Sequence, residues 1–389
     1  GICVRVCPKK AITIDRKAGI LKINTELCDG ESCKICIEKC PMRILVLGEQ
    51  FREWRFPILE KKHKKKFFGN LLEEVIKPAI CSHCTACSAI CPVKGITAGD
   101  KPIDFPNWLK DCVDCGACVK VCPRWDYKPL NGIGNYIEIF SAKSKRFTGQ
   151  DGAMVTEFTA TALEENIIEK AIFVARDEEW RTRIVTINDS EQLKDTKITG
   201  TKYTFADVLP AVKEAILDSK AIAFVGTPCM ISALRRMQKA FKKFERVKLA
   251  IGLFCTENFY YSQLSEFLLK NKNVDLKTVL KTDIKKGKFI VKKADGELSF
   301  AVKELDAIVP SGCKVCQDFS AVESDLSVGS VGSEAGFSTV VVRSEIAKRI
   351  ADAIKAKGYA EFKEASIDAV KKLCDYKVKI HPYQQRKEV

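Results

Sequence analysis

Cysteines in a repeated spacing are the residues of this sequence with the clearest chemistry. The pattern C-x2-C-x2-C-x3-C-P occurs without deviation at 81–92 and again at 112–123. Three closely spaced thiolates of such a motif hold one 4Fe-4S cluster, and the fourth, before proline, reaches the neighbouring cluster. Zinc sites use two cysteine pairs and leave the third cysteine and the Cys-Pro unexplained, so clusters are favoured. The crossed ligand sets are Cys81, Cys84, Cys87 and Cys122, and Cys112, Cys115, Cys118 and Cys91.

The start of the chain follows the same pattern incompletely. Residues 28–41 read C-x4-C-x2-C-x3-C-P, and Cys3 and Cys7 occupy the last two positions of a preceding motif. Two such motifs are typical of a bacterial-type ferredoxin. We therefore expect the chain to be a fragment whose first ligand pair lies upstream, so that Cys3 and Cys40 supply two of four ligands to an outer cluster. The set that is complete here is Cys28, Cys33, Cys36 and Cys7.

Four further cysteines lie outside these motifs. The apolar runs "AIAFVG" and "KLAIGL" predict buried strands, and Cys229 and Cys255 follow them closely. Ligands gather outside the carboxyl ends of parallel strands, so both thiols are expected at one sheet edge. "SGCKVCQD" adds Cys313 and Cys316 from a loop, which gives four thiolates for a fifth 4Fe-4S cluster. The alternative is a pair of buried structural thiols beside a separate C-x-x-C that is redox-active or binds zinc.

The cysteine motifs and the composition divide the chain into four parts. We expect a ferredoxin module at 1–50, a basic linker containing "KKHKKKFF" at 51–70, a second ferredoxin module with two 4Fe-4S clusters at 71–130, and an α/β domain at 131–389. Cys374 is left over as a structural thiol. His83 lies inside a cysteine motif but is not needed as a ligand.

The last part alternates predicted helices and strands. "MVTEFTATALEENIIE" and "FADVLPAVKEAILDSK" have helical apolar spacing, "AIFVAR" and "AIAFVG" are strand-like, and "STVVVRSEIAKRIADAIKAKG" is a strand running into a helix. This order predicts a partly parallel sheet. The expected fold class is an α/β C-terminal domain preceded by two bacterial-type α+β ferredoxin modules. No G-x-G-x-x-G follows a predicted strand, so a nicotinamide-binding unit is not supported.

The charge and the cysteine content limit the classes of protein to which this chain can belong. The formal charge of +15 suggests nucleic acid, but five 4Fe-4S clusters of about −2 each would lower it to roughly +5. No nucleic-acid partner is therefore expected. Nineteen cysteines at metal-ligand spacings favour a reducing cytoplasm over a disulfide framework. We see no signal peptide and no apolar run long enough for a membrane span, so any membrane association would be made through a partner.

A row of clusters conducts single electrons, and hydride chemistry at its end requires a converter such as a flavin. The turn "TGQDGAMVTEF" is a candidate flavin loop, because Gly149 and Gly152 permit close backbone approach and a helix N-terminus follows.

Residues 131–389 resemble the beta subunit of coenzyme F420-reducing hydrogenase and its relatives. The matching stretches are "TGQDGAMVTEF", "GTKYTFADVLPAV", "AFVGTPCMISALR", "IGLFC", "CKVCQD" and "DLSVGSVGSEAGFSTVVVRS", in the family's order. The second ferredoxin module is similar to the N-terminal part of F420H2 dehydrogenase input subunits. The additional module at 1–50 departs from the simplest members of the family. The family is typical of anaerobic methanogenic archaea.

The resemblance implies FAD in the α/β domain, a nearby 4Fe-4S cluster, and hydride exchange with coenzyme F420, with electrons passing to or from a redox partner protein. It implies that Lys202 sets the potential of the reduced flavin, and it identifies no catalytic acid or base. The alternative function is a non-catalytic polyferredoxin relay whose α/β domain only docks. The implied flavin-binding residues are Gly149, Gln150, Asp151, Gly152, Ala153, Thr156, Thr201, Lys202, Tyr203, Gly226 and Thr227.

Overall fold

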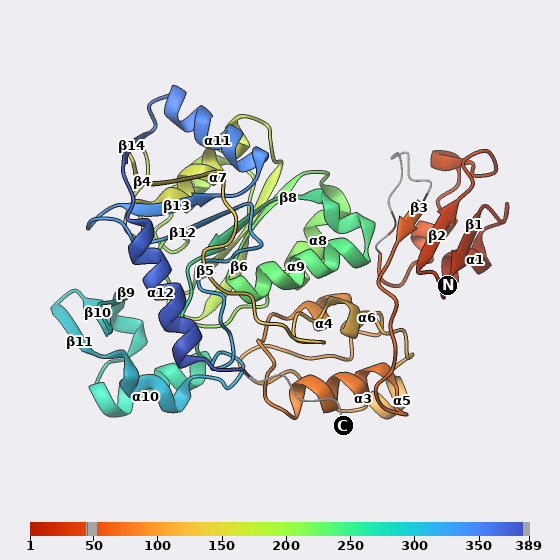
Figure 1. The fold of residues 1–389 in the computed structure, drawn as a ribbon, viewed down its shortest axis with the longest axis horizontal. Coiled ribbons are helices and arrows are strands. Elements are labelled where there is room, and N and C mark those ends of the chain that lie inside the picture. The colour runs from red at the N-terminus through yellow and green to blue at the C-terminus, as the bar shows by residue number, and fades with distance from the viewer. Residues whose placement is uncertain (44, 46–52, 384–389) are drawn as a thin grey trace.

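The N-terminal module is a small antiparallel sheet with two short helices. The computed structural model describes residues 1–43, 45 and 53–383 (Figure 1), so the expected boundary at 50/51 lies outside the described residues. Strand β2 lies between β1 and β3 and pairs antiparallel with both. Because β3 belongs to this sheet, part of the expected linker extends the first module. The elements are α1 (Ile2–Val6), β1 (Ile12–Asp15), β2 (Ile20–Ile23), the 3-10 turn η1 (Gly30–Ser32), α2 (Ile35–Glu38) and β3 (Glu53–Arg55).

The second module consists of short helices around the cysteine motifs. Thr85 and Gly116 adopt left-handed backbone conformations, with φ of 65° and 72°, at equivalent places in the two motifs. Each turn lets the chain enter a helix directly after the second cysteine of its motif. Thr97 and Asp104 form an isolated antiparallel bridge. The elements are α3 (Phe67–Leu71), the π-helical turn η2 (Leu72–Ile76), α4 (Ala86–Ile90), α5 (Trp108–Asp111) and α6 (Ala117–Val121).

An eight-stranded mixed sheet forms the centre of the C-terminal domain. Its strand order is β14-β4-β13-β12-β8-β7-β5-β6. The four central strands β12, β8, β7 and β5 are parallel, and the outer strands pair antiparallel. The partly parallel sheet predicted from the sequence is therefore present. Its strands are β4 (Glu138–Ser144), β5 (Lys170–Arg176), β6 (Thr182–Ile187), β7 (Ile222–Gly226), β8 (Val247–Leu253), β12 (Leu326–Gly329), β13 (Ser338–Val342) and β14 (Ala360–Lys363).

Helices cover both faces of this sheet, as buried parallel strands require. Helices α7 and α11 pack on one face, and α8 and α9 pack on the other (Figure 1). Pro228 at the first position of α9 follows Thr227 at the end of β7, which is a favourable start for a helix. The helices are α7 (Met154–Glu164), α8 (Val208–Asp218), α9 (Pro228–Ala240), α11 (Glu345–Ala356) and α12 (Ile367–Ile380), with the 3-10 turns η3 (Ser190–Lys194) and η4 (Lys242–Arg246).

A separate lobe lies between β8 and β12 in the sequence and was not predicted. Its three-stranded antiparallel sheet and its helix enclose their own core, which includes Phe289 and Leu264. Helix α12 runs past this lobe toward the second module (Figure 1). The elements are α10 (Tyr261–Lys272), η5 (Leu276–Thr278), β9 (Val279–Lys285), β10 (Lys288–Lys293), β11 (Gly296–Ala301) and η6 (Val302–Ile308).

The second module and the α/β domain share one hydrophobic core. Ala86 and Ile90 of α4 and Val121 of α6 belong to the same buried cluster as residues of α8 and α9. The N-terminal module touches this region through Trp54, whose indole N–H donates to the Ala240 carbonyl at 3.4 Å. The shared core fixes the ferredoxin motifs against one face of the sheet.

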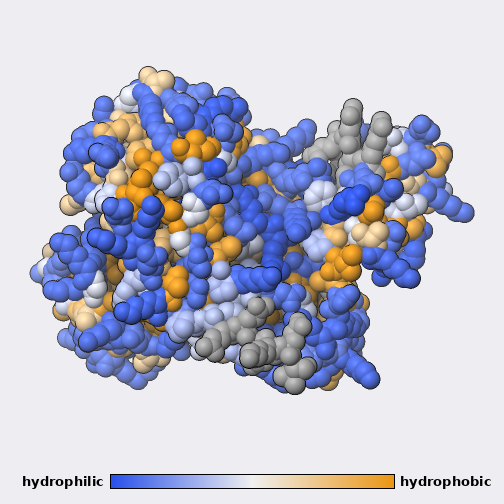
Figure 2. Space-filling model, in the orientation of Figure 1, coloured by the Kyte–Doolittle hydropathy of each residue, from blue (hydrophilic) through white to orange (hydrophobic). Residues whose placement is uncertain are grey.

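The face shown in Figure 2 is mostly hydrophilic, with hydrophobic residues scattered over it. Within the part of the chain that the structure describes, no helix has the length and apolar character needed to span a membrane.

Candidate iron–sulfur and flavin sites

One predicted ligand set of the second module surrounds a small cavity. Cys81, Cys84, Cys87 and Cys122 all line a space of about 20 Å³. Burial raises the pKa of Cys84, and the neighbouring Cys122 and Cys229 thiols raise it further. The crossed arrangement deduced from spacing therefore corresponds to the positions of these side chains.

The second set gathers in the same way. Burial raises the pKa of Cys118, and Cys115, Cys112, Cys122 and Cys91 add to the effect because their thiols lie nearby. Cys115 is exposed, whereas Cys91 and Cys118 are buried. This set therefore lies nearer the surface than the first one.

The four cysteines of the α/β domain also converge. Cys229 opens α9, Cys255 follows β8, and Cys313 and Cys316 come from the loop before β12. Burial raises the pKa of Cys313 to about 12, with contributions from the nearby Cys229 and Cys316. The Thr227 hydroxyl lies 3.3 Å from the Cys229 sulfur. Three segments that are far apart in the sequence thus bring four thiols to the carboxyl edge of the parallel strands.

This set and the first ferredoxin set lie side by side. The Cys229 thiol donates to the Ser82 carbonyl at 3.8 Å, and Ser82 follows the ligand Cys81 directly. A Cβ atom on Gly312 would come within 1.8 Å of the Cys81 carbonyl oxygen. The loop carrying Cys313 therefore packs directly on the ferredoxin motif.

Two buried cations lie beside these thiols, and neither was predicted from the sequence. Lys377 of α12 is 1% exposed, and Arg124, after the last motif, is 3% exposed. Burial alone raises the pKa of Cys316, but the Lys377 and Arg124 charges outweigh it and lower that pKa. Lys377 is separated from Cys316 by about sixty residues of sequence, so local spacing gives no signal of the contact.

The cysteines of the N-terminal module form a looser group. Burial raises the pKa of Cys36, and Cys28, Cys3, Cys7 and Cys33 lie close enough to contribute. Cys40 is a neighbour of Lys243 in the α/β domain. Among the described residues, no three His, Cys, Asp or Glu side chains approach closely enough to hold a single metal ion.

Two further residues were predicted not to be cluster ligands. The Nε2 atom of His83 lies 2.8 Å from the Gly99 carbonyl oxygen. Cys374, which was expected to be a structural thiol, is fully buried.

A larger cavity lies at the candidate flavin loop. Its volume is about 210 Å³, and four of the residues implied to bind flavin, Gly149, Gln150, Thr201 and Lys202, contribute to its wall. The other lining residues, which come from the start of the candidate loop, from β5 and the segment after it, from the loop before Thr201 and from the added lobe, were not among the predicted flavin residues. They are Thr148, Arg176, Trp180, Thr196, Thr199, Gly200, Leu280 and Lys281.

The cavity is suited to a negatively charged ligand with hydrogen-bonding groups. Arg176, Lys202 and Lys281 line it, and no carboxylate of the described residues does. Gln150 Oε1 and Trp180 Nε1 are buried and have no hydrogen-bond partner among the described residues. Buried polar atoms normally have a partner, so these two atoms fit a bound polar group. The donors, the acceptor and the charges are compatible with FAD.

Burial lowers the pKa of Lys202 to about 7, and the Arg176 charge adds to this effect. The Lys202 ammonium donates to the carbonyls of Ile198, at 2.5 Å, and Gly200, at 2.8 Å. The site therefore holds a cation that an anionic ligand would stabilise.

The other predicted flavin residues do not line this cavity. Gly152 packs on the sheet, where an added Cβ would come within 2.2 Å of the Ala142 carbonyl, and Thr156 is buried in α7. Ala153 adopts a left-handed φ of 56°. Asp151 pairs with Lys285 of β9 at 2.7 Å. The remaining three are Tyr203, Gly226 and Thr227.

Tyr203 lies between the two sites. It is half-buried, burial raises its pKa, and Asp283, Cys255 and Asp151 are close enough to contribute. Gly226 and Thr227 lie at the end of β7, beside Cys229. Tyr203 therefore connects the cavity region to the four thiols, whereas Gly226 and Thr227 lie with the thiols.

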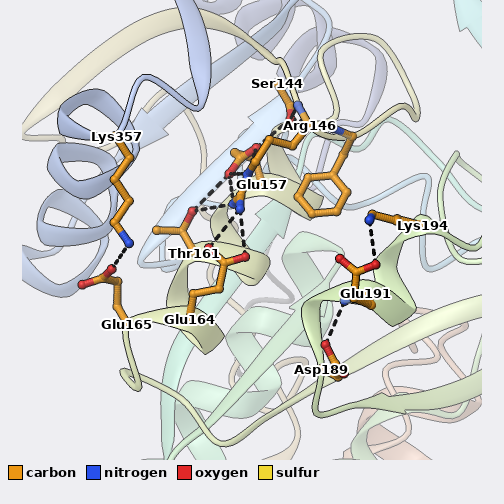
Figure 3. Close-up of polar contacts among 11 residues, drawn as sticks. Ser144, Arg146, Glu157, Thr161, Glu164, Glu165, Asp189, Glu191, Lys194 and Lys357 are labelled. Carbon is orange, nitrogen blue, oxygen red and sulfur yellow. Dashed lines mark hydrogen bonds and ion pairs between the residues drawn. The ribbon is translucent and has the colours of Figure 1, made fainter.

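The candidate flavin loop is anchored by a buried charge network (Figure 3). Glu157 of α7 is fully buried and accepts hydrogen bonds from the Ser144 hydroxyl, at 2.6 Å, and the Arg146 guanidinium, at 2.5 Å. Arg146 also pairs with Glu164 at 2.8 Å. Residues 144–146 lead into the loop, so this network fixes its starting point.

Replacing Glu157 with alanine is expected to destabilise the domain by about 3 kcal/mol, because it leaves the partly buried Arg146 with Glu164 as its remaining ion-pair partner. The control is Glu165→Ala, which removes only the solvent-exposed pair with Lys357 and is worth about 0–1 kcal/mol. Anaerobic denaturant unfolding of the full chain measures both. Equal destabilisation by the two variants would contradict this account of the network.

The fold and the grouped thiols define an iron–sulfur protein with an α/β domain. Residues 73–123 match the family described as "4Fe-4S dicluster domain". Residues 139–213 match the N-terminal part, and residues 219–368 the C-terminal part, of the family described as "Coenzyme F420 hydrogenase/dehydrogenase, beta subunit". The chain belongs to this family of beta subunits.

Individual relatives agree with the family. A protein of Methanosarcina mazei that is named as one of the subunits of F(420)H(2) dehydrogenase is 32% identical over 73% of this chain and 85% of its own length. Coenzyme F420-dependent sulfite reductase of Methanocaldococcus jannaschii is 33% identical over 79% of this chain, which spans 50% of that protein. A protein of the F420-reducing [NiFe] hydrogenase complex from Methanosarcina barkeri aligns with 65% of this chain and 92% of its own, with a TM-score of 0.61 and 29% identity.

Proposed function

We propose that this chain exchanges a hydride with coenzyme F420 at a bound FAD and passes the electrons singly through 4Fe-4S clusters to or from a partner protein. The observation that carries the proposal is the order of the sites. Tyr203 follows the cavity residue Lys202 and is a neighbour of Cys255, and Cys229 of the same four thiols contacts the segment that carries the ferredoxin ligand Cys81. Relatives named as subunits of F420H2 dehydrogenase and F420 hydrogenase support F420 as the substrate.

In this proposal the cavity residues hold the cofactor. Gln150 and Trp180 supply the two free hydrogen-bonding groups, and Arg176, Lys202 and Lys281 balance its negative charge. FAD supplies the conversion between a hydride and two single electrons. The chain's task is to bind and orient it. No side chain is assigned as a general acid or base.

The electron route then runs outward through the cysteine sets. Tyr203 and Cys255 are neighbours, and Cys229 contacts the segment that carries Cys81. Cys118 is in turn a neighbour of Cys122, which joins the two ferredoxin sets. Lys120 lies close to both Cys115 and Arg16, so the N-terminal module borders the second set.

We further propose that these roles belong to a first module that ends with β3, a linker between β3 and α3, a second module that begins with α3, and an α/β domain at 131–389. The cluster on Cys3 and Cys40 is the outermost one and the point of contact with the partner protein. The chain works in the cytoplasm, and any attachment to a membrane is made by partner subunits.

Flavin content tests the proposal. Full-length protein purified anaerobically is expected to contain about one FAD per chain, together with iron and sulfide for its clusters. Full cluster content without flavin, even after incubation with FAD, would contradict the proposal and would favour a relay that only carries electrons between other proteins.

Flavin affinity is expected to depend on pH through Lys202. The pKa of this lysine is about 7 in the free protein, far below its usual value, and a bound anion raises it. Above pH 7 binding therefore requires proton uptake, and affinity falls by up to about tenfold per pH unit. Below pH 7 the lysine is already charged and affinity is constant.

Titration of flavin-depleted protein with FAD between pH 6 and about 9, followed by flavin fluorescence, measures this dependence. Lys202→Met is expected to bind FAD weakly at every pH, with the decline above pH 7 abolished. Lys281→Met is the matched control, because it removes a cation from the same wall but should keep the decline. An unchanged pH profile in Lys202→Met would contradict this role.

A further inference from the structure

Lys377 is buried in an environment that requires a nearby negative charge. Lysine is almost never fully buried unless it is paired, yet this side chain is 1% exposed. Among the described residues it makes no ion pair with an Asp or Glu side chain. Its ammonium donates to the carbonyl oxygens of Cys255, at 2.6 Å, and Asp318, at 2.7 Å, and it lies 3.8 Å from the Cys316 sulfur.

The cysteine set supplies most of that charge, and the Asp318 carboxyl, which makes no ion pair with Lys377, is close enough to add to it. Cys255 and Cys316 are two of the four thiols of the α/β domain, and a 4Fe-4S cluster with four thiolates carries a net charge of about −2. Burying an uncompensated ammonium is costly, so the lysine and the cluster stabilise each other. The two carbonyl contacts also fix the ammonium relative to both ligand-bearing segments.

Arg124 is a second cation, but it is shared between two sites. It lines the cavity of the Cys81 set, and its Nη2 donates to the Gly312 carbonyl at 3.2 Å. Its guanidinium lies 4.0 Å from the centre of the Tyr127 ring, and its Nη1 has no hydrogen-bond partner among the described residues. The charge of Lys377 therefore acts on the cluster of the α/β domain, whereas the charge of Arg124 acts on that cluster and on the cluster of the Cys81 set.

We propose that Lys377 is a positioning residue that raises the reduction potential of the cluster on Cys229, Cys255, Cys313 and Cys316, and so makes it a stronger electron acceptor. Reduction adds one negative charge to the cluster, and a fixed cation nearby stabilises the reduced state more than the oxidised state. The low dielectric of the site increases the effect. The inference rests on the proposed function only in assuming that these thiols hold a cluster.

The test is a redox titration of the full chain followed by electron paramagnetic resonance. Lys377→Gln keeps hydrogen-bond donors but removes the charge. It is expected to shift the reduction equilibrium of one cluster at least tenfold toward the oxidised state, which is about 59 mV for a one-electron couple. Lys377→Arg should keep the native potential. Lys372→Gln, on the exposed side of the same helix, is the control and should change nothing.

Several outcomes separate the explanations. An intact cluster with unchanged potential in Lys377→Gln would overturn the proposal and leave Lys377 as a structural tie. If that variant fails to fold, Arg124→Gln is decisive, because the charge account expects the potentials of two clusters to fall, and unchanged potentials would overturn it. A native protein in which this set holds no cluster would overturn the inference and that part of the proposed relay, whereas the flavin test stands apart from both.

Discussion

Replacing Cys255 with alanine is expected to remove one cluster and interrupt the electron route. The variant should contain about four fewer iron atoms per chain, because a 4Fe-4S cluster needs all four thiolates. F420H2 should still reduce the flavin, but the ferredoxin clusters should no longer be reduced in the same period. Iron analysis and anaerobic absorbance changes measure the two effects separately.

Cys374→Ala is the matched control for this experiment. Cys374 is fully buried among hydrophobic side chains such as Val370, and it lies outside the four grouped thiols. Its replacement should cost some stability but no iron. Normal cluster reduction in Cys255→Ala, or equal iron loss in both variants, would contradict the assignment of Cys255 as a ligand.

Replacing Gly312 with valine is expected to disturb the contact between the α/β domain and the ferredoxin motif. A Cβ at this position would meet the Cys81 carbonyl at 1.8 Å, and this neighbour is backbone that cannot rotate away. Overpacking of this kind costs about 1–3 kcal/mol. Because electron tunnelling falls steeply with distance, transfer between the two clusters should slow as the segments separate.

Rapid-mixing absorbance of the loaded protein measures that step. Ser311→Ala is the control, since this neighbour is exposed and its truncation leaves the Cys81 contact in place. Native transfer rates and native stability in Gly312→Val would show that the close approach between the two segments has no role in the relay.

The sequence predicted the parts of this protein that depend on local spacing. Strand β7 was recognised from the apolar run "AIAFVG", and the mixed sheet followed from the order of helices and strands. The matched family confirms the resemblance. The crossed cysteine sets were deduced from motif spacing alone, and the structure brings those thiols together.

The sequence did not predict contacts between distant segments. Lys377 reaches Cys316 from a helix at the end of the chain, and one buried lysine in a helical pattern resembles an exposed one. Trp180 and Arg176 join the cavity through the path of β5 and the loop after it. The lobe containing β9 was missed because its lysine-rich alternation resembles a solvated segment.

The prediction of the domain boundaries was also limited, because these boundaries depend on pairing between distant segments. The expected linker 51–70 contains β3, which completes the N-terminal sheet by pairing with β2. The same range contains the start of α3, whose residues Phe68 and Leu71 are buried in the core of the second module. A charged run at 61–66 gave no indication of these contacts on either side.

The central claim is that a hydride enters at one end of this chain and single electrons leave at the other. Anaerobic mixing of full-length, flavin-loaded protein with F420H2, followed at the deazaflavin and cluster wavelengths, tests it directly. The account predicts rapid F420H2 oxidation, followed by bleaching of several clusters. An absence of F420H2 oxidation, with flavin and clusters both present, would contradict it and would point to another hydride donor.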